Sequence, residues 1–368
     1  IIASLLFLTL SLTFALQARF SHEPFTWLPE DNPARIATDF VNANMKGASS
    51  AEIIIDTGHE NGLYDPAIMA GLAQLGQDVE KIATDQLYVG KSQSVADLLK
   101  EIHKALNENR DEFYTTPDDR ELIAQEFLLF ENSGSDDLED LVDNQFQKAR
   151  FTAKMPWVDS IYYGDFVADL HEMFSTVLGT GVVITVTGMA VLLGQTVVAA
   201  IYSMSEGYIL AGGIITIMMV LLIGNIRLGL LSMIPNLAPI IVILGIMGLF
   251  DLPLDLFTML IGSIAIGLAV DDTIHFMHNY RRYYGKYGDL ERAIKETLHT
   301  SGRAMLVTTI VLSTGFFLYV FSSLNNLFNF GILTGLTIIM ALLSLFFLAP
   351  ALLHRAHKYN LIPDSKDY

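Results

Sequence analysis

The chain has 368 residues, of which 52% are hydrophobic, and this is more apolar than an ordinary soluble domain of that length. Its formal net charge of −18 argues against nucleic acid as a partner, because nucleic-acid binding needs clustered Lys and Arg. The absence of cysteine removes disulfides, thiolate metal sites and cysteine nucleophiles.

The charge is confined to one part of the chain. Residues 17–206 hold 12 Lys and Arg against 31 Asp and Glu, which leaves 10 and 9 for the rest of the sequence. The acidic segment is therefore expected to be exposed to water. The remainder contains long stretches with few charges, and these stretches are expected to lie in a membrane.

The chain opens on an apolar run over residues 1–16, without the basic leader and small-residue cleavage site of a signal peptide. We interpret this run as a first transmembrane helix that is truncated at its N-terminal end. A span needs about 20 apolar residues, and five further spans are predicted, which gives six in all. They lie at residues 208–224, 228–250, 256–276, 304–321 and 327–353.

The segment between the first two spans is predicted to fold as an α+β domain over residues 17–192. Short β-rich runs at 51–56 and 182–188 indicate strands. Four amphipathic or capped segments indicate helices, and strands interleaved with helices favour a small α+β sandwich. These helices are expected at residues 65–82, 94–107, 118–131 and 159–178. Residues 193–207 are expected to form an interfacial helix leading into the membrane, with a longer second span as the alternative.

The distribution of Lys and Arg predicts the orientation of the spans. The loop after the fourth span carries Arg281, Arg282 and Lys286, whereas the loops at residues 251–255 and 322–326 carry no basic residue. The basic side is expected to be cytoplasmic, together with a tail over residues 354–368. The acidic domain is then extracytoplasmic. A charged helix at residues 289–300 is expected to be an interfacial connector on the cytoplasmic side.

Two adjacent acids, Asp271 and Asp272, are the strongest functional signal. They lie roughly 15 Å along a helix from the Arg281-Arg282 pair, well inside the hydrocarbon, where each charge costs about 2.5–3.5 kcal/mol on insertion scales. Adjacent carboxylates also repel each other, so the pair is expected to exchange a proton. The alternative is a helix that ends early and leaves both acids in water.

Other polar residues are expected near this pair. Gly267 and His275 lie four residues before and after Asp271, on the same helix face. Gly267 would allow close helix packing at the relay, and His275 could share a proton. Thr308 and Thr309 lie at a comparable depth in the next span, although Ser and Thr are also common in membrane helices as packing residues. Asn236 is interpreted as a structural hydrogen-bonding residue.

The sequence predicts neither a metal nor a cofactor. The histidines lack the spacing of zinc ligands, and no phosphate-binding loop of the Walker type is present. The acidic run at residues 136–140 lacks the spacing and the glycine of a calcium loop, and is interpreted as a solvated helix start.

The order of one span, a large α+β domain and five more spans resembles the C-terminal half of a permease of the resistance-nodulation-division (RND) superfamily. Within it, the chain resembles the MMPL-type and hydrophobe-exporter branch, which is related to Patched, Dispatched and the sterol-sensing domain. The motifs that carry the resemblance are Gly267-Leu-Ala-Val-Asp271-Asp272, Ser232-Met-Ile-Pro235-Asn236-Leu-Ala-Pro239 and Ala349-Pro350-Ala351-Leu352-Leu353.

The resemblance implies twelve spans in two six-span halves, a porter-like domain in each half, and export driven by inward proton flow. It places the proton relay at Asp271, Asp272, His275, Thr308 and Thr309, with Gly267 packing beside it. The drug-efflux branch has a Lys in this helix, and none lies in residues 256–276. The chain therefore resembles the branch with acids in both halves, and the N-terminal half is its expected partner.

The function expected from the sequence is export of hydrophobic or lipid-like molecules across the inner membrane of a bacterium. Substrate would be moved without conversion, so the protein is expected not to be an enzyme. A homo-oligomer or a periplasmic accessory protein is a further expected partner. The alternatives are a lipid- or sterol-sensing membrane protein without active transport, and an accessory translocation motor similar to SecD/SecF.

Overall fold

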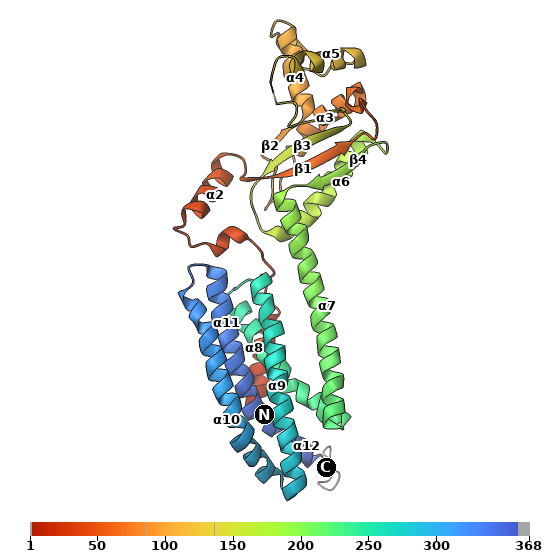
Figure 1. Cartoon of the computed structure of the whole chain (residues 1–368). Helices are drawn as coiled ribbons and strands as arrows, with labels where there is room; N and C mark the ends of the chain where they lie inside the picture. Colours follow the sequence, from red (N-terminus) through yellow and green to blue (C-terminus); the bar gives the residue numbers. More distant parts are fainter. Residues whose placement is uncertain (1, 85, 136, 360–368) are drawn as a thin grey trace. The chain divides into compact units, whose positions relative to one another are not determined.

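A computed structural model describes residues 2–84, 86–135 and 137–359 and divides the chain into two compact units (Figure 1). The sheet unit comprises Glu23–Phe25 and Glu30–Val198. The helical unit comprises Ile1–His22, Thr26–Pro29 and Ala199–Tyr368.

The sheet unit is built on a four-stranded antiparallel sheet in the order β2-β3-β1-β4 (Figure 1). The central strand β1 (Ser49–Asp56) pairs on one side with β3 (Lys148–Met155) and on the other with β4 (Val183–Thr187). The short strand β2 (Lys91–Gln93) pairs with β3 and forms the edge.

One face of this sheet is buried under helices. Alternate residues of β1, including Ile53 and Ile55, are fully buried, as a strand with one covered face requires. Phe151 and Ala153 of β3 lie in the same core. The helices of this unit are α2 (Pro33–Asn44), α3 (Pro66–Val79), α4 (Val95–Leu106), α5 (Arg120–Glu131) and α6 (Tyr163–Leu178).

The predicted helices and strands of this unit are confirmed within a few residues of their ends. Asp65 caps α3 by accepting a hydrogen bond from Ala67 N at 2.9 Å, and Pro66 occupies the first helical position. Three elements were not predicted, namely α2, β2 and β3. The predicted helix start at residues 136–140 is wrong, because the described residues 137–141 form turns.

Among the described residues, five helices are long and apolar enough to cross a membrane, and the first of them begins in the sheet unit and enters the helical unit at Ala199. The first three are α7 (Met189–Ile223), α8 (Ile226–Leu249) and α9 (Leu256–Tyr287). The fourth, Leu290–Phe321, begins with α10 (Leu290–Phe317). The fifth, Asn325–Lys358, contains α11 (Asn325–Leu343) and α12 (Ala349–Lys358). The first helix, α1 (Ile2–Ala15), is shorter than a full span. The count of six spans therefore stays a prediction.

Two predicted breaks between helices are wrong. The predicted interfacial helix at residues 193–207 and the predicted span at residues 208–224 form one continuous helix, α7. The alternative of a longer helix is therefore the one that holds. Gly207 alone does not end it, because an isolated glycine in a helix costs only about 1 kcal/mol. At 1.5 Å per residue α7 is about 52 Å long, more than the roughly 30 Å of a hydrocarbon core. The predicted connector at residues 289–300 is likewise the first part of α10.

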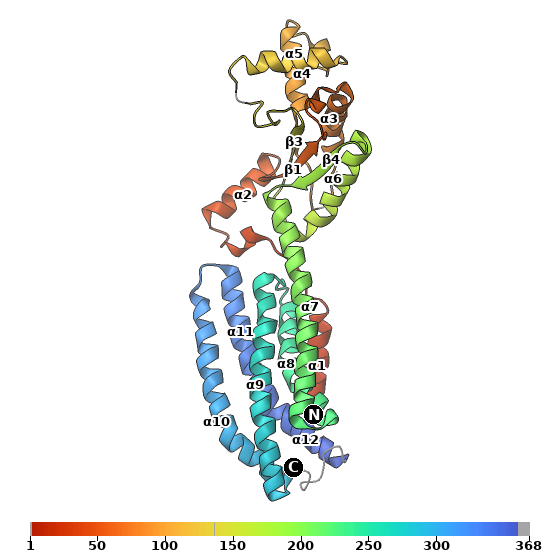
Figure 2. The ribbon, with the colours of Figure 1, turned by 45° about the vertical axis from the view of Figure 1, so that its right-hand side comes forward.

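α1 packs along α8, where two glycines permit a close approach (Figure 2). A Cβ at Gly245 or Gly248 would collide with the backbone of Ser11 or Phe14. Small residues at such positions are typical of membrane helix pairs. The chain beyond α1 is held by Arg19, whose guanidinium pairs with the Asp251 carboxylate at 2.5 Å.

α8 contains two prolines, and a side chain from the last span compensates for one of them. Pro239 has no N–H, so the carbonyl of Pro235, four residues earlier, lacks its helical donor. Ser344 Oγ donates a hydrogen bond to that carbonyl at 3.0 Å. Ser344 begins a π-helical turn over Ser344–Leu348, between α11 and α12. The π-turn and the proline pair therefore face each other in the helical unit.

Candidate functional site

The acid pair lies within a continuous helix. α9 begins at Leu256, where Asp255 caps it by accepting from Thr258 N at 2.7 Å, and it continues past the acids to Tyr287. The alternative of a helix that ends early at Asp271 and Asp272 is therefore wrong. Gly288, with φ of +65°, ends the helix in a left-handed conformation that glycine adopts readily.

Both acids line a cavity of about 340 Å³ between α9, α10 and α11. Its polar lining comes from α9 and α10, and its apolar lining includes residues of α11. The structure brings together all five residues that were predicted for the relay. These are Asp271, Asp272, His275, Thr308 and Thr309, and Ser301 joins them.

The two carboxyl groups differ in their surroundings. Asp271 is exposed, with 70% of its side chain accessible, and its Oδ1 lies 3.7 Å from Nε2 of His275, one turn further along the helix. Asp272 is half-buried. A small shift would bring Asp271 and His275 into hydrogen-bonding distance.

The two threonines come from α10 and face the acids across the cavity. Thr308 Oγ1 donates to the carbonyl of Met305 at 2.9 Å, and a hydroxyl oxygen that donates in this way keeps lone pairs for a second partner. Thr309 is buried beside it. This placement fits hydroxyl groups that bind a carboxyl group or a water molecule.

Gly267 lies on the same exposed stripe of α9 as Asp271 and His275, outside the cavity lining. A Cβ at Gly267 would meet no atom within 4 Å. The close packing predicted at this glycine is therefore not made by any helix in the described part of this chain. It stays a prediction for a partner.

Hydrogen bonds from α9 to neighbouring helices hold the site in place. Thr273 Oγ1 donates to Oδ1 of the buried Asn236 in α8 at 2.5 Å. Nδ2 of Asn279 donates to Oγ of Ser301 in α10 at 2.7 Å. The structural role predicted for Asn236 is confirmed. Asn279 and Ser301 were missed, although their depths in adjacent helices on the basic side were readable from the sequence.

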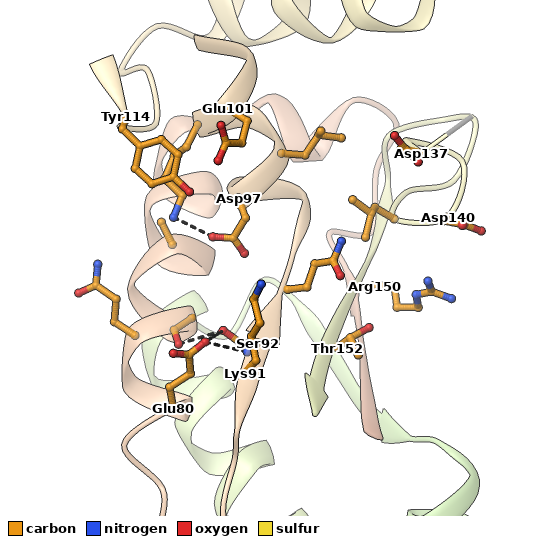
Figure 3. Close-up of a pocket in the computed structure, with 17 residues that line it drawn as sticks. Glu80, Lys91, Ser92, Asp97, Glu101, Tyr114, Asp137, Asp140, Arg150 and Thr152 are labelled. Atoms are coloured by element: carbon orange, nitrogen blue, oxygen red, sulfur yellow. Dashed lines mark hydrogen bonds and ion pairs between the residues drawn. The ribbon is translucent and has the colours of Figure 1, made fainter. Parts of the chain in front are cut away.

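A larger cavity, of about 680 Å³, lies in the sheet unit and is lined by many charged side chains (Figure 3). Glu80 accepts hydrogen bonds from both N and Oγ of Ser92, at 2.8 and 3.1 Å. Lys100 pairs with Asp97 at 2.7 Å. Such a lining does not suit an apolar molecule, because burying a charge against one leaves it without compensation. The cavity of the helical unit, with its two carboxyl groups beside a histidine and two threonines, is therefore the stronger candidate site.

The described residues contain no group of three His, Asp or Glu side chains arranged to hold a metal ion.

Comparisons with known proteins agree with the membrane half of this structure. The profile of a family described as "MMPL family" matches residues 162–367. A protein of Methanocaldococcus jannaschii that is named as a membrane protein is 34% identical over 152 residues, which is 40% of this chain. The matched segment spans 39% of that relative, so the two proteins correspond over well under half of its length.

Proposed function

This chain belongs to the MMPL family, and on that premise we propose that it is the C-terminal half of an RND-type permease. The permease exports hydrophobic or lipid-like molecules, and inward proton flow drives it. Substrate is moved and not converted. The protein lies in the cytoplasmic membrane, with the sheet unit outside as a porter-like domain and the C-terminus inside.

One observation carries this proposal, namely a membrane helix that presents two carboxyl groups, with a histidine and two threonines, to one cavity. A carboxylate in the hydrocarbon region is costly and marks a proton or ion pathway more often than a structural contact. Asp272 is half-buried beside the cavity and Asp271 is close to His275. A proton bound by one carboxylate can pass to the imidazole and leave on the other side.

The proposal includes a second half with acids of its own. The stripe of α9 that carries Gly267, Asp271 and His275 is exposed, and a Cβ at Gly267 would meet no described atom within 4 Å. Charged side chains in membrane proteins face a bundle interior or a water-filled cavity, so this stripe is a surface for another helix bundle. We propose the N-terminal six-span half as that bundle.

The decisive experiment uses the full-length permease reconstituted into vesicles with a trapped pH-sensitive dye. A fluorescent long-chain acyl ester serves as the export probe, and both export and proton flux are followed. Asp271→Asn and Asp272→Asn keep the side-chain size and remove the exchangeable charge. We expect the double variant to lose probe-dependent proton flux and proton-driven export down to the level of empty vesicles.

Glu206→Gln is the matched control, because it removes an exposed carboxylate of the same unit outside α9. It is expected to keep proton flux and export. If the double variant exported the probe at the unmodified rate under the same proton gradient, the transport proposal would be overturned. Probe binding that persisted without any dependence on pH would then favour a lipid-sensing protein.

A further inference from the structure

A second polar cavity of the helical unit lies at the basic end of α9, away from the acid pair. It has a volume of about 550 Å³, and its lining residues are Leu222 of α7 and five residues of α9. The five are His278, Arg281, Arg282, Gly285 and Lys286. Their spacing of three and four residues places them on one face of two helical turns.

The lining carries positive charge, and among the described residues no carboxylate contributes to it. Within the described residues, Arg282 and Lys286 form no ion pair, although basic residues elsewhere in the chain do, as Lys104 does with Asp111 at 2.6 Å. Unneutralised positive charge gathered in a concave surface attracts an anion more strongly than the same charge on a convex one.

Backbone and aromatic contacts hold the basic side chains in position. Nη1 of Arg281 donates to the carbonyl of Leu222, in the last turn of α7, at 2.7 Å. The guanidinium of Arg282 lies 5.1 Å from the ring centroid of Tyr283, and Nζ of Lys286 lies 5.1 Å from that of Tyr287. An arginine fixed in this way loses less side-chain freedom on binding a ligand, so the cavity is preorganised.

The depth of the cavity identifies the kind of anion. Arg281 lies ten residues beyond Asp271, or about 15 Å along the helix, which corresponds to half of a hydrocarbon core. Tyr283 and Tyr287 lie about 3 and 9 Å further along the helix, and tyrosines gather where the hydrocarbon meets the headgroups. The exposed apolar side chains of α7, such as Leu221, reach this level and offer a surface for acyl chains.

We propose that this cavity binds the phosphate group of an anionic phospholipid, with Arg281, Arg282 and Lys286 around the headgroup. Basic pockets between membrane helices bind such headgroups by charge and hydrogen bonds. Leu222 and the exposed apolar face of α7 then lie beside the acyl chains. The inference concerns the lipid contacts of the protein, and it holds whether or not the acid pair moves protons.

The test uses the purified full-length protein in phosphatidylcholine vesicles that contain a trace of spin-labelled lipid. Electron spin resonance measures the association of labelled phosphatidylglycerol relative to labelled phosphatidylcholine. We expect a preference for phosphatidylglycerol that the double variant Arg282→Gln/Lys286→Gln lowers by about fivefold for each charge removed. Arg281 is left in place, because its hydrogen bond to α7 also has a structural role.

The matched control is Lys295→Gln/Arg355→Gln, which removes one Lys and one Arg from exposed positions outside the cavity. This control is expected to keep the full lipid preference. Equal losses in the two double variants would overturn the proposal and indicate a diffuse basic surface. Line broadening of inorganic phosphate in phosphorus NMR, without any preference for phosphatidylglycerol, would also overturn it and indicate a site for free phosphate.

Discussion

Asp271 and Asp272 are consecutive, yet an α-helix turns by about 100° between them, so their carboxyl groups have different surroundings. Both line the cavity, but Asp271 is exposed and lies near His275, whereas Asp272 is half-buried. The sequence predicted the pair, its partners and its depth. It did not predict this difference, because the rotation of α9 against α10 is set by packing residues that show no distinctive pattern.

A titratable residue outside the membrane helices gives a prediction on pH. Oδ1 of Asp56, at the end of β1, accepts hydrogen bonds from Gln147 Nε2 at 2.9 Å and Gly58 N at 2.8 Å. These bonds, with Lys148 nearby, hold the pKa of Asp56 below its ordinary value of 3.8. The folded state therefore binds this proton less tightly than the unfolded state. The stabilisation is present above the ordinary pKa and is lost as pH falls through the lowered pKa.

Asp56→Asn should consequently lower the unfolding free energy of the sheet unit at neutral pH. Below about pH 4 the variant should lose less stability with falling pH than the unmodified protein does. Thermal unfolding followed by the fluorescence of Trp157, in the Trp27→Phe background, measures both effects across a pH series. Glu139→Gln removes an exposed carboxylate of the same unit and should change neither. An unchanged pH profile in Asp56→Asn would show that the hydrogen bonds to Asp56 do not stabilise the fold.

At the scale of elements, segments with a clear cap or hydrophobic pattern in the sequence were predicted. Segments whose conformation depends on pairing with another strand or helix were not. α3 has a capping Asp65 followed by Pro66, and its helix was predicted. β3 alternates buried residues such as Ala149 and Phe151 with Lys148 and Arg150, but alanines and charges are weak strand formers. Its pairing with β1 decides its conformation. The continuity of α7 was missed because a change in polarity does not by itself end a helix.

The proline pair of α8 gives a prediction at the same scale. Ser344→Ala leaves the carbonyl of Pro235 without a donor in the helical unit. We expect a loss of about 0.6 kcal/mol in unfolding free energy, and up to about 1.7, the range found for hydrogen bonds between membrane helices. Pro239→Ala supplies an N–H four residues after Pro235 and offers the same carbonyl a helical donor.

The two substitutions therefore make a double-mutant cycle. In the Pro239→Ala background, Ser344→Ala should cost clearly less than it does alone, as denaturation of the purified protein in mixed micelles would measure. Thr337→Ala is the control, since its buried hydroxyl bonds only to Leu333 of its own helix. Additive effects of Pro239→Ala and Ser344→Ala would show that the π-turn does not support α8.

At the scale of the whole molecule, the most informative surface is the exposed stripe of α9. It contains Leu260, Ser263, Gly267, Asp271 and His275 at intervals of three and four residues, and each is exposed. The carboxylate and imidazole groups of this stripe are costly against lipid, and this cost supports the proposed partner half. The sequence predicted that Gly267, Asp271 and His275 share this face, but not that Leu260 and Ser263 continue it or that the face is exposed.

Gly267 provides a test of this surface. A Cβ there meets no described atom within 4 Å, so Gly267→Leu should not lower the thermal stability of this chain and should raise it slightly, because glycine is a poor helix former. In the full-length permease the larger side chain should abolish export if a partner helix packs closely at this point. Gly207→Leu is the control, because a Cβ at this exposed glycine of α7 also meets no atom within 4 Å. Unimpaired export in Gly267→Leu would contradict close packing of another half on this stripe.

The π-turn at Ser344–Leu348 also affects how the last span tolerates changes in length. A π-turn accommodates one residue more than an α-helical turn. Removing a single residue there would restore regular α-helix and leave the faces of α11 and α12 in register. The same deletion inside α11 would rotate every later residue by about 100°. The last span can therefore lose one residue within this turn and keep the register of the helices on either side.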